Sequence, residues 1–365
     1  MAKNKKKYWI PLSLLLFIVY TFVAARPIPV ETILVPRWLS SLESDYPVSL
    51  ESGGTTAEPL EEEVLLPFKL GSHFGYVDAQ GFFSINRVRK GYVSLSEEYW
   101  AEYEAVPETV AVFDPRERPM VRIDHPRGYP FFLDKRIFVI NDEQNSLSLV
   151  DSSGEIRWVH DFAAPVTDID AAAGLVLAGS LDGAVELLGE GGERLFFFEP
   201  GGSRLSVILS CRISGDGSKL AIVSGYDDQR FLLLEKFGDS YKVSYHEFIS
   251  DGFRRPVHLA FIGNDSRIVF ERKEGIGIYD INTRNSLKIP LDGSISAIES
   301  SGKDNLFFII TSKPGGQNKL VAIRLPGTII MEAPFKSGDS FLARRNSRLF
   351  VGGGTTLAAF DLDKR

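Results

Sequence analysis

A short apolar strand that ends in a turn residue recurs along this chain, and this repeat constrains the fold more than any other feature. Eight such strand ends occur, at positions 78, 114, 151, 189, 236, 280, 324 and 361, so successive ends lie 36 to 47 residues apart. Their mean spacing is close to 40 residues. Repeats of this length, built from four short strands, are typical of the blades of a β-propeller.

The interior of one repeat supports the same interpretation. Residues 205–247 contain four strand-like runs, and the sequences between them are Gly-Asp-Gly-Ser, Tyr-Asp-Asp-Gln and Phe-Gly-Asp-Ser. These are turn sequences, and hairpins of this kind build antiparallel sheets. No long amphipathic helical pattern lies between the repeats, so the sequence argues against a fold of alternating strands and helices. We therefore predict an all-β propeller.

The number of blades follows from how the strand ends are counted. Seven intervals between ends predict seven blades, with eight as the alternative because there are eight ends. The chain stops soon after the strand that ends at Phe360–Asp361, so its last blade needs an outer strand from elsewhere. We expect a strand such as Gly81–Arg87 to complete that blade and close the ring, which would remove the exposed sheet edges.

The repeats resemble those of WD40-like and quinoprotein-like propellers. The stretch Ser214–Val223 and the strand ends at Tyr279–Asp280 and Phe360–Asp361 carry the resemblance, which covers about residues 62–365. The chain has no Trp-Asp pair of the WD40 type. Quinoprotein-like propellers include periplasmic scaffold proteins of outer-membrane assembly, so the resemblance implies a non-catalytic, protein-binding propeller of the cell envelope.

The first 25 residues predict a membrane anchor. Four lysines between positions 3 and 7 precede the uncharged run Tyr8–Ala25, whose 18 residues are enough for one helix to cross a bilayer. Lysines on this side favour a cytoplasmic N-terminus with the rest of the chain on the extracytoplasmic, periplasmic side. The small residues Val23-Ala24-Ala25 leave a cleaved signal peptide as the alternative. We expect an uncleaved, single-pass anchor in the cytoplasmic (inner) membrane.

Residues 26–63 differ in composition from the rest and predict a linker. Five prolines, two adjacent glycines and the run Glu61-Glu62-Glu63 are typical of an extended spacer. The stretch Ile33–Leu42 is more apolar, so we expect it to dock as a short helix with Trp38 as its most ordered residue. The predicted organisation is therefore an anchor (1–25), an acidic Pro-rich linker (26–63) and a propeller (64–365).

Composition and motifs argue against several kinds of chemistry. The net charge of −7 does not favour binding of nucleic acid, whose phosphates need clustered Lys and Arg. Cys211 is the only cysteine, so the chain has neither an internal disulfide nor a CxxC motif. The five histidines lack metal-ligand spacing, and no Gly-x-Ser-x-Gly sequence occurs. We predict no catalytic residue, no metal ligand and no bound cofactor.

One region combines aromatic and charged residues and is the candidate interaction surface. Residues 87–107 interleave tyrosine and tryptophan with glutamates, and the Pro-rich loop 115–130 follows with four arginines. Aromatic side chains and Arg are enriched where proteins bind one another. The alternative interpretation is an ordinary outer strand. The predicted contact residues are Tyr99, Trp100, Tyr103, Arg116, Arg118, Arg122 and Arg127.

These observations favour a membrane-anchored, non-enzymatic scaffold for protein–protein interactions in the assembly or maintenance of the cell envelope. Two other classes stay open. One is a propeller that binds glycan or peptidoglycan, marked by aromatic side chains along one face. The other is a hydrolase or lyase, marked by polar residues of several blades that converge in the central channel with shifted pKa values. The partner, the face that binds it and the oligomeric state do not follow from the sequence.

Overall fold

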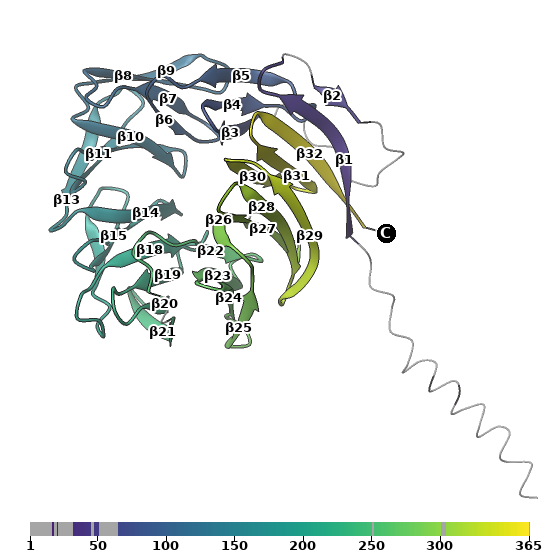
Figure 1. Ribbon diagram of the computed structural model, residues 1–365. Helices are drawn as coiled ribbons and strands as arrows, with labels where there is room; N and C mark the ends of the chain where they lie inside the picture. Colours follow the sequence, from purple (N-terminus) through teal and green to yellow (C-terminus); the bar gives the residue numbers. More distant parts are fainter. Residues whose placement is uncertain are drawn as a thin grey trace, which may run out of the picture.

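The computed structural model describes residues 32–44, 47–50, 65–249, 252–300 and 304–364, together with Phe17 and Tyr20. The strands form eight antiparallel sheets arranged around a central opening (Figure 1). Each sheet is one blade of a β-propeller, and blades are numbered 1 to 8 in chain order. The prediction of an all-β propeller is confirmed.

The strands follow the chain from blade to blade. Blades 1 and 2 consist of β3 (Leu66–Leu70), β4 (His73–Val77), β5 (Phe83–Val88) and of β6 (Tyr92–Leu95), β7 (Trp100–Tyr103), β8 (Thr109–Phe113), β9 (Pro119–Asp124). Blades 3 and 4 consist of β10 (Gly128–Leu133), β11 (Arg136–Asn141), β12 (Ser146–Val150), β13 (Ile156–Asp161) and of β14 (Val166–Ala172), β15 (Leu175–Ser180), β16 (Val185–Leu188), β17 (Arg194–Phe198). Blades 5 and 6 consist of β18 (Ile208–Ile213), β19 (Lys219–Ser224), β20 (Arg230–Phe237), β21 (Ser240–Phe248) and of β22 (Leu259–Ile262), β23 (Arg267–Arg272), β24 (Gly275–Asp280), β25 (Asn285–Pro290). Blades 7 and 8 consist of β26 (Ser294–Glu299), β27 (Leu306–Lys313), β28 (Gln317–Arg324), β29 (Thr328–Lys336) and of β30 (Ser340–Arg345), β31 (Arg348–Gly353), β32 (Thr356–Lys364), β1 (Thr32–Ser41), β2 (Val48–Ser49).

The propeller has eight blades, so the prediction of seven is wrong and its alternative is right. Each of the eight predicted strand ends lies at or near the end of the third strand of a different blade, from Asp78 after β4 to Asp361 in β32. Eight strand ends are separated by only seven intervals. In a closed ring each of the eight repeats forms a blade, so counting intervals gave one blade too few. The segment 81–87 does not close the ring, since β5 pairs with β4 as the outer strand of its own blade.

Strand β1 closes the ring, although it lies within the range 26–63 predicted as linker. It pairs with β32 along its whole length, with a register shift between Pro36 and Trp38. The stretch predicted as a short helix is therefore a strand. Trp38 is ordered, as expected: it is 4% exposed, and its indole N–H donates to the Ala79 carbonyl of blade 1 at 2.9 Å. The propeller thus begins at Thr32, not at residue 64.

The cores lie in the seams between neighbouring blades, because side chains alternate between the two faces of each strand. Phe231 of blade 5 and Phe270 of blade 6, for example, stack with ring centroids 4.5 Å apart, and both are fully buried. Burial of one such side chain stabilises the fold by about 1.5–3 kcal/mol. Repetition of these seams around the ring makes the scaffold rigid, so function belongs to the loops at its two ends.

The meander of each blade defines two faces of the ring. Loops that precede the first strand and join the second strand to the third lie at one end, called the upper face here. Loops that join the first strand to the second and the third to the fourth lie at the lower face. Backbone hydrogen bonds hold the upper loops together: the Phe162 amide donates to the Asn145 carbonyl, and the Ile249 amide donates to the Gln229 carbonyl.

Blade 1 departs from this pattern. The Arg89 amide donates to the Ser72 carbonyl, which repeats the upper-face bond of the other blades and identifies β3, β4 and β5 as its second, third and fourth strands. Within the described ranges no strand occupies the first position of this blade. Strand β3 is short and carries Pro67 and the exposed Lys69, residues that protect a strand edge from pairing with other chains.

The predicted membrane anchor falls almost entirely outside the described residues. Of the run 8–25, the structure describes only Phe17 and Tyr20. Among the described residues, no helix has the length and apolar character that crossing a membrane requires.

Candidate interaction surface

Trp100 is not a surface residue, contrary to its predicted role. It begins strand β7, is 2% exposed and stacks on Phe113 with ring centroids 4.8 Å apart. Its indole N–H donates to the Asp114 carbonyl at 3.0 Å. Trp100 belongs to the seam between blades 1 and 2, where a large aromatic side chain fills the interior, and it cannot contact a partner.

The two predicted tyrosines lie at opposite ends of blade 2. Tyr99 is part of the lower loop between β6 and β7 and packs on Phe132. Tyr103 ends β7 at the upper face, where it stacks on Tyr92 and lies against Tyr129. Burial raises the pKa of the Tyr103 hydroxyl. Of these rings, Tyr92 is the most exposed, at 58%.

The four predicted arginines also separate. Arg116 and Arg118 lie in the lower turn between β8 and β9, where Arg118 pairs with Asp114 at 2.5 Å. Arg122 is on the outer strand β9 and pairs with the exposed Asp124. Arg127 precedes β10 at the upper face. The predicted set is therefore divided among both faces and the outer rim, and it does not form one surface.

An apolar hollow of about 300 Å³ opens at the upper face over blades 4, 5 and 6. Three exposed apolar side chains surround it, since Leu181, Leu205 and Tyr226 are 54%, 58% and 40% exposed. Turns project them: Leu181 lies between β15 and β16, Tyr226 between β19 and β20, and Leu205 before β18. The other lining residues are Thr167, Ser206, Val207, Ile208, Leu209, Arg254, Arg255 and Pro256.

Two arginines are the charged residues that line this hollow. Arg255 forms an ion pair with the buried Glu271 at 2.6 Å. Arg254 is exposed, and its guanidinium lies 3.5 Å from the centre of the Tyr226 ring. Among the described residues Arg254 has no carboxylate within ion-pair distance. The hollow therefore combines apolar walls with one cation that is available to an acidic group.

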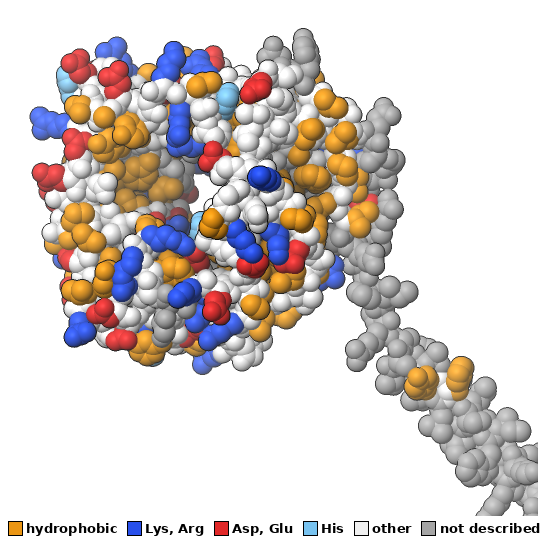
Figure 2. Space-filling model, in the orientation of Figure 1, with side chains coloured by type: hydrophobic (Ala, Val, Ile, Leu, Met, Phe, Trp, Pro, Cys, Tyr) orange, Lys and Arg blue, Asp and Glu red, His pale blue; other side chains and the backbone are white. Residues whose placement is uncertain are grey.

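A second apolar hollow of about 330 Å³ lies in the seam between blades 3 and 4. Phe131 and Ile140 line it from blade 3, and Val166 and Ile169 line it from blade 4. Figure 2 shows hydrophobic side chains gathered on this wall of the ring, beside the central opening. Thr167 lines both hollows, and its hydroxyl donates to the Ile208 carbonyl at 2.7 Å. The two hollows together are called the upper trough.

Charged groups of neighbouring blades meet in the channel beside the trough, and one of them, Asp168, also lines the second hollow. The Asp168 carboxylate accepts hydrogen bonds from the Cys211 amide at 2.9 Å, the Ser210 hydroxyl at 2.8 Å and the Arg212 guanidinium at 2.7 Å. Burial raises the pKa of the neighbouring Asp170 carboxyl, which accepts the Ile213 amide. Because each carboxylate joins β14 to β18, we interpret the group as a clamp between blades 4 and 5.

His258 of blade 6 lies close to this clamp. Burial lowers the pKa of its imidazole, and Glu271 opposes that shift. Within the residues that the structure places, no group of three or more His, Cys, Asp or Glu side chains is arranged to hold a metal ion. Polar residues with shifted pKa values do converge in the channel. The carboxylates among them form hydrogen bonds that join neighbouring blades.

Comparison with known proteins agrees with this architecture. A family model described as beta-propeller protein matches residues 1–364, and the chain belongs to this family of beta-propeller proteins. An uncharacterized protein of Treponema pallidum (strain Nichols) is 27% identical over 360 residues, which cover 99% of this chain and 95% of that protein. The crystal structure of BamB from Moraxella catarrhalis matches with a TM-score of 0.59 over 90% of this chain and 100% of the other. At 14% identity this likeness shows the fold alone.

The sequence contains a signal for the trough that a pattern of interleaved aromatic and charged residues does not include. Leu181, Leu205 and Tyr226 stand inside polar turn sequences, where an apolar residue has no partner within its own hairpin. Where such turns of neighbouring blades lie at the same end of the ring, their apolar side chains are exposed together and belong to the surface, not to a core. Assigning it requires knowing which turns share a face.

Proposed function

We propose that this chain is a non-enzymatic, quinoprotein-like propeller that binds a partner protein of the cell envelope through its upper trough. In this proposal residues 8–25 tether it to the cytoplasmic membrane, and the propeller lies on the extracytoplasmic side. The observation that carries the proposal is the trough, where exposed apolar side chains surround two neighbouring hollows that share Thr167. Isolated exposed apolar residues are ordinary, but a contiguous apolar surface of this kind marks an interaction site.

The chemistry of the trough indicates what kind of segment it binds. Its apolar walls require an apolar segment, because polar groups buried there would lose their hydrogen bonds to water. Arg254 favours a carboxylate on the ligand, since its guanidinium is exposed, stacks on Tyr226 and donates only to the Tyr226 and Phe253 carbonyls among the described residues. The expected ligand is therefore an apolar protein segment with an acidic residue next to it.

The carboxylates of the clamp between blades 4 and 5 do not favour an enzymatic function. A catalytic base needs a carboxylate or imidazole free to accept a proton from a substrate. Asp168 instead accepts three hydrogen bonds from blade 5, and the buried Ser210 is one of the donors. These contacts join two blades and support the non-enzymatic part of the proposal.

Photo-crosslinking from the trough tests the proposal in the full-length protein. A benzophenone amino acid replaces Leu205 in native membranes, and the same replacement of Val159, 53% exposed on the outer strand β13, is the control. We expect one protein adduct from position 205 and none from position 159. The crosslinked segment of the partner should be apolar, with an acidic residue next to it. Equal adducts from both positions, or an adduct with glycan alone, would contradict partner binding through the trough.

A further inference from the structure

The place where the chain enters the propeller orients it relative to the proposed tether. Strand β1 is antiparallel to β32, so it runs from the lower face to the upper face and Thr32 lies at its lower end. Only residues 26–31 separate the run 8–25 from β1. Six residues span at most about 20 Å when fully extended. A tether at Ala25 therefore holds the lower face towards the membrane.

The lower rim of the ring is lined with exposed apolar side chains. In every blade from 1 to 7, one apolar residue at or near the lower end of the outer strand is 37% to 56% exposed. These residues are Phe82, Met120, Ile156, Leu195, Val243, Leu287 and Ile329. Any one of them alone would be ordinary, but one such side chain recurs in each of seven blades at the end where the chain enters, and this set is called the apolar ring.

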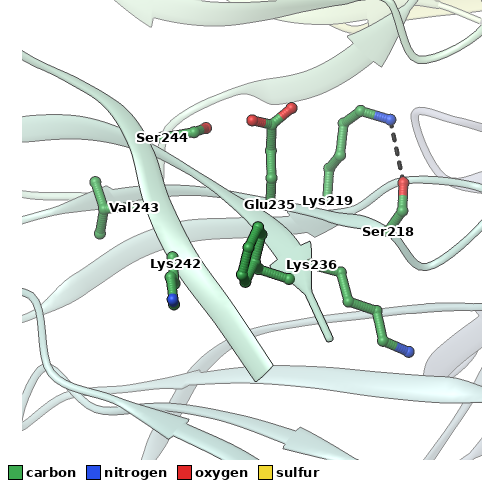
Figure 3. Close-up of a pocket in the computed structure, with 8 residues that line it drawn as sticks. Ser218, Lys219, Glu235, Lys236, Lys242, Val243 and Ser244 are labelled. Carbon is green, nitrogen blue, oxygen red and sulfur yellow. Dashed lines mark hydrogen bonds between the residues drawn. The ribbon is translucent and has the colours of Figure 1, made fainter. Parts of the chain in front are cut away.

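The lower end of blade 5 adds an aromatic tip and a cationic hollow. Phe237, in the hairpin between β20 and β21, is 70% exposed. The Lys242 ammonium lies 4.4 Å from the centre of its ring. The adjoining hollow of about 400 Å³ is lined by Ser218, Lys219, Glu235, Lys236, Phe237, Lys242, Val243 and Ser244 (Figure 3). Three lysines and one glutamate give this hollow a positive charge.

We propose that the lower rim rests on the lipid bilayer, with Phe237 at the interface and these lysines against anionic headgroup phosphates. This inference rests on the proposed tether. Aromatic rings and the long stems of lysine are favourable at the level of the headgroups. Phe82 of blade 1 lies four blades from Phe237, so the apolar ring contacts the interface on opposite sides. The upper trough then faces away from the membrane, towards a partner.

Paired labels on blade 5 test this orientation. Asp239→Cys places a thiol in the lower hairpin, and Asp228→Cys places one in the upper turn between β19 and β20; both positions are exposed. The native Cys211 is fully buried and does not compete for label. Full-length protein is labelled with a nitrobenzoxadiazole dye and assembled into phosphatidylcholine–phosphatidylglycerol nanodiscs with a headgroup nitroxide lipid. We expect at least about a twofold loss of fluorescence at position 239 and no loss at position 228.

Variants of the lysines and of Phe237 separate the electrostatic contribution to membrane contact from the apolar one. Lys236→Glu with Lys242→Glu should weaken quenching at position 239 when phosphatidylglycerol is present, since each lysine near an anionic surface contributes about fivefold in partitioning. Phe237→Ser should weaken quenching with or without phosphatidylglycerol. Protein that enters nanodiscs but shows equal quenching at both positions overturns the contact of the lower rim and leaves the tether standing. Protein that fails to enter them overturns the tether and this inference together.

Discussion

The two seams that flank blade 4 are built from opposite sides of one strand. On the side of blade 3, β14 presents Val166 and Ile169, which line an apolar hollow that is open to solvent. On the side of blade 5 it presents Asp168 and Asp170, whose carboxylates bind backbone amides and Arg212 of β18. Because the register of β14 shifts between Val166 and Asp168, alternation along the strand places Val166 and Ile169 on one side and Asp168 and Asp170 on the other, with Asp168 also at the edge of the hollow.

The difference shows how a rigid ring can carry an open binding surface. A seam whose inner strands are joined by ion pairs and hydrogen bonds has no surface left for a partner. The seam between blades 3 and 4 has cross-blade contacts too, since Arg136 donates to the Gly174 and Leu175 carbonyls at 2.8 Å and His160 lies 3.1 Å from the Glu186 carboxylate. Among the described residues none of these contacts joins its inner strands β10 and β14, and its half-buried side chains there gain further burial when a ligand enters. We therefore assign stability to the seam of blades 4 and 5, and binding to the upper trough.

The largest effect is expected from breaking the clamp. Asp168→Ala removes the acceptor of three donors and should destabilise the protein by about 3 kcal/mol, the lower end for buried ion pairs because the Arg212 side chain is 32% exposed. The shift in the urea midpoint at constant slope measures this loss. Asp124→Ala, which removes an exposed ion pair, is the control and should cost less than about 0.5 kcal/mol. A loss at Asp168 no larger than that of the control would break the comparison.

A substitution in the seam between blades 3 and 4 should affect stability less than Asp168→Ala does, and partner binding more. Ile140→Ser removes an apolar side chain from the wall of the hollow and should weaken capture of the partner by about tenfold, as for a residue at the centre of an interface. Partner bound at equal protein concentrations, with unfolding measured in parallel, separates the two effects. Arg212→Ala breaks the same clamp from blade 5 and lies outside the lining of both hollows, so this variant should retain full binding. If the clamp variant lost binding and Ile140→Ser kept it, binding would belong to the seam of blades 4 and 5 and not to the trough.

Acid should destabilise the protein through His258, which is half-buried in blade 6. Burial lowers the pKa of His258 in the folded state, so the unfolded chain takes up the proton first as the pH falls below about 6.5. Stability from this group is therefore present at neutral pH and is lost on acidification, by about 1 kcal/mol per unit of lowering in pKa. Urea unfolding at pH 7.5 and pH 5.5 should show a smaller difference for His258→Gln than for the unchanged protein. The exposed His246→Gln variant should leave that difference unchanged.

The smallest effect is expected at the lower turn of blade 2. Arg116 is exposed and has no ion-pair partner among the described residues, so Arg116→Ala should change stability by less than about 0.5 kcal/mol. Partner binding should also be unaffected, because this turn is on the face opposite the trough. A loss of capture would restore the segment 115–130 as a binding surface and count against the trough.

The repeat made the architecture predictable, because every blade carries an apolar third strand and these strands recur about every 40 residues. Ring closure was harder to predict, since β1 lies in a stretch whose prolines and acidic surroundings are typical of a linker. Its pairing with β32 joins residues more than 300 positions apart, with a register shift after Pro36. Local patterns carry no information about a pairing at that distance.

The candidate site could be predicted less well than the fold. Trp100, Tyr103 and Arg116 are close in sequence, yet one is in a core seam and the others lie at opposite faces. Residues of one blade alternate between faces every few positions, so closeness in sequence does not indicate a shared surface. The trough is assembled from turns of several blades, and the packing of blade 4 against blade 5 brings Leu181, Leu205 and Tyr226 together.

Hydrogen exchange of the full-length protein, with and without its crosslinked partner, tests the division between the two faces most directly. We predict slower exchange in the upper segments 163–169, 203–209 and 225–229, and unchanged exchange in the lower turns 114–118 and 236–240. Protection of the lower turns, with none in the upper segments, would contradict partner binding through the upper trough.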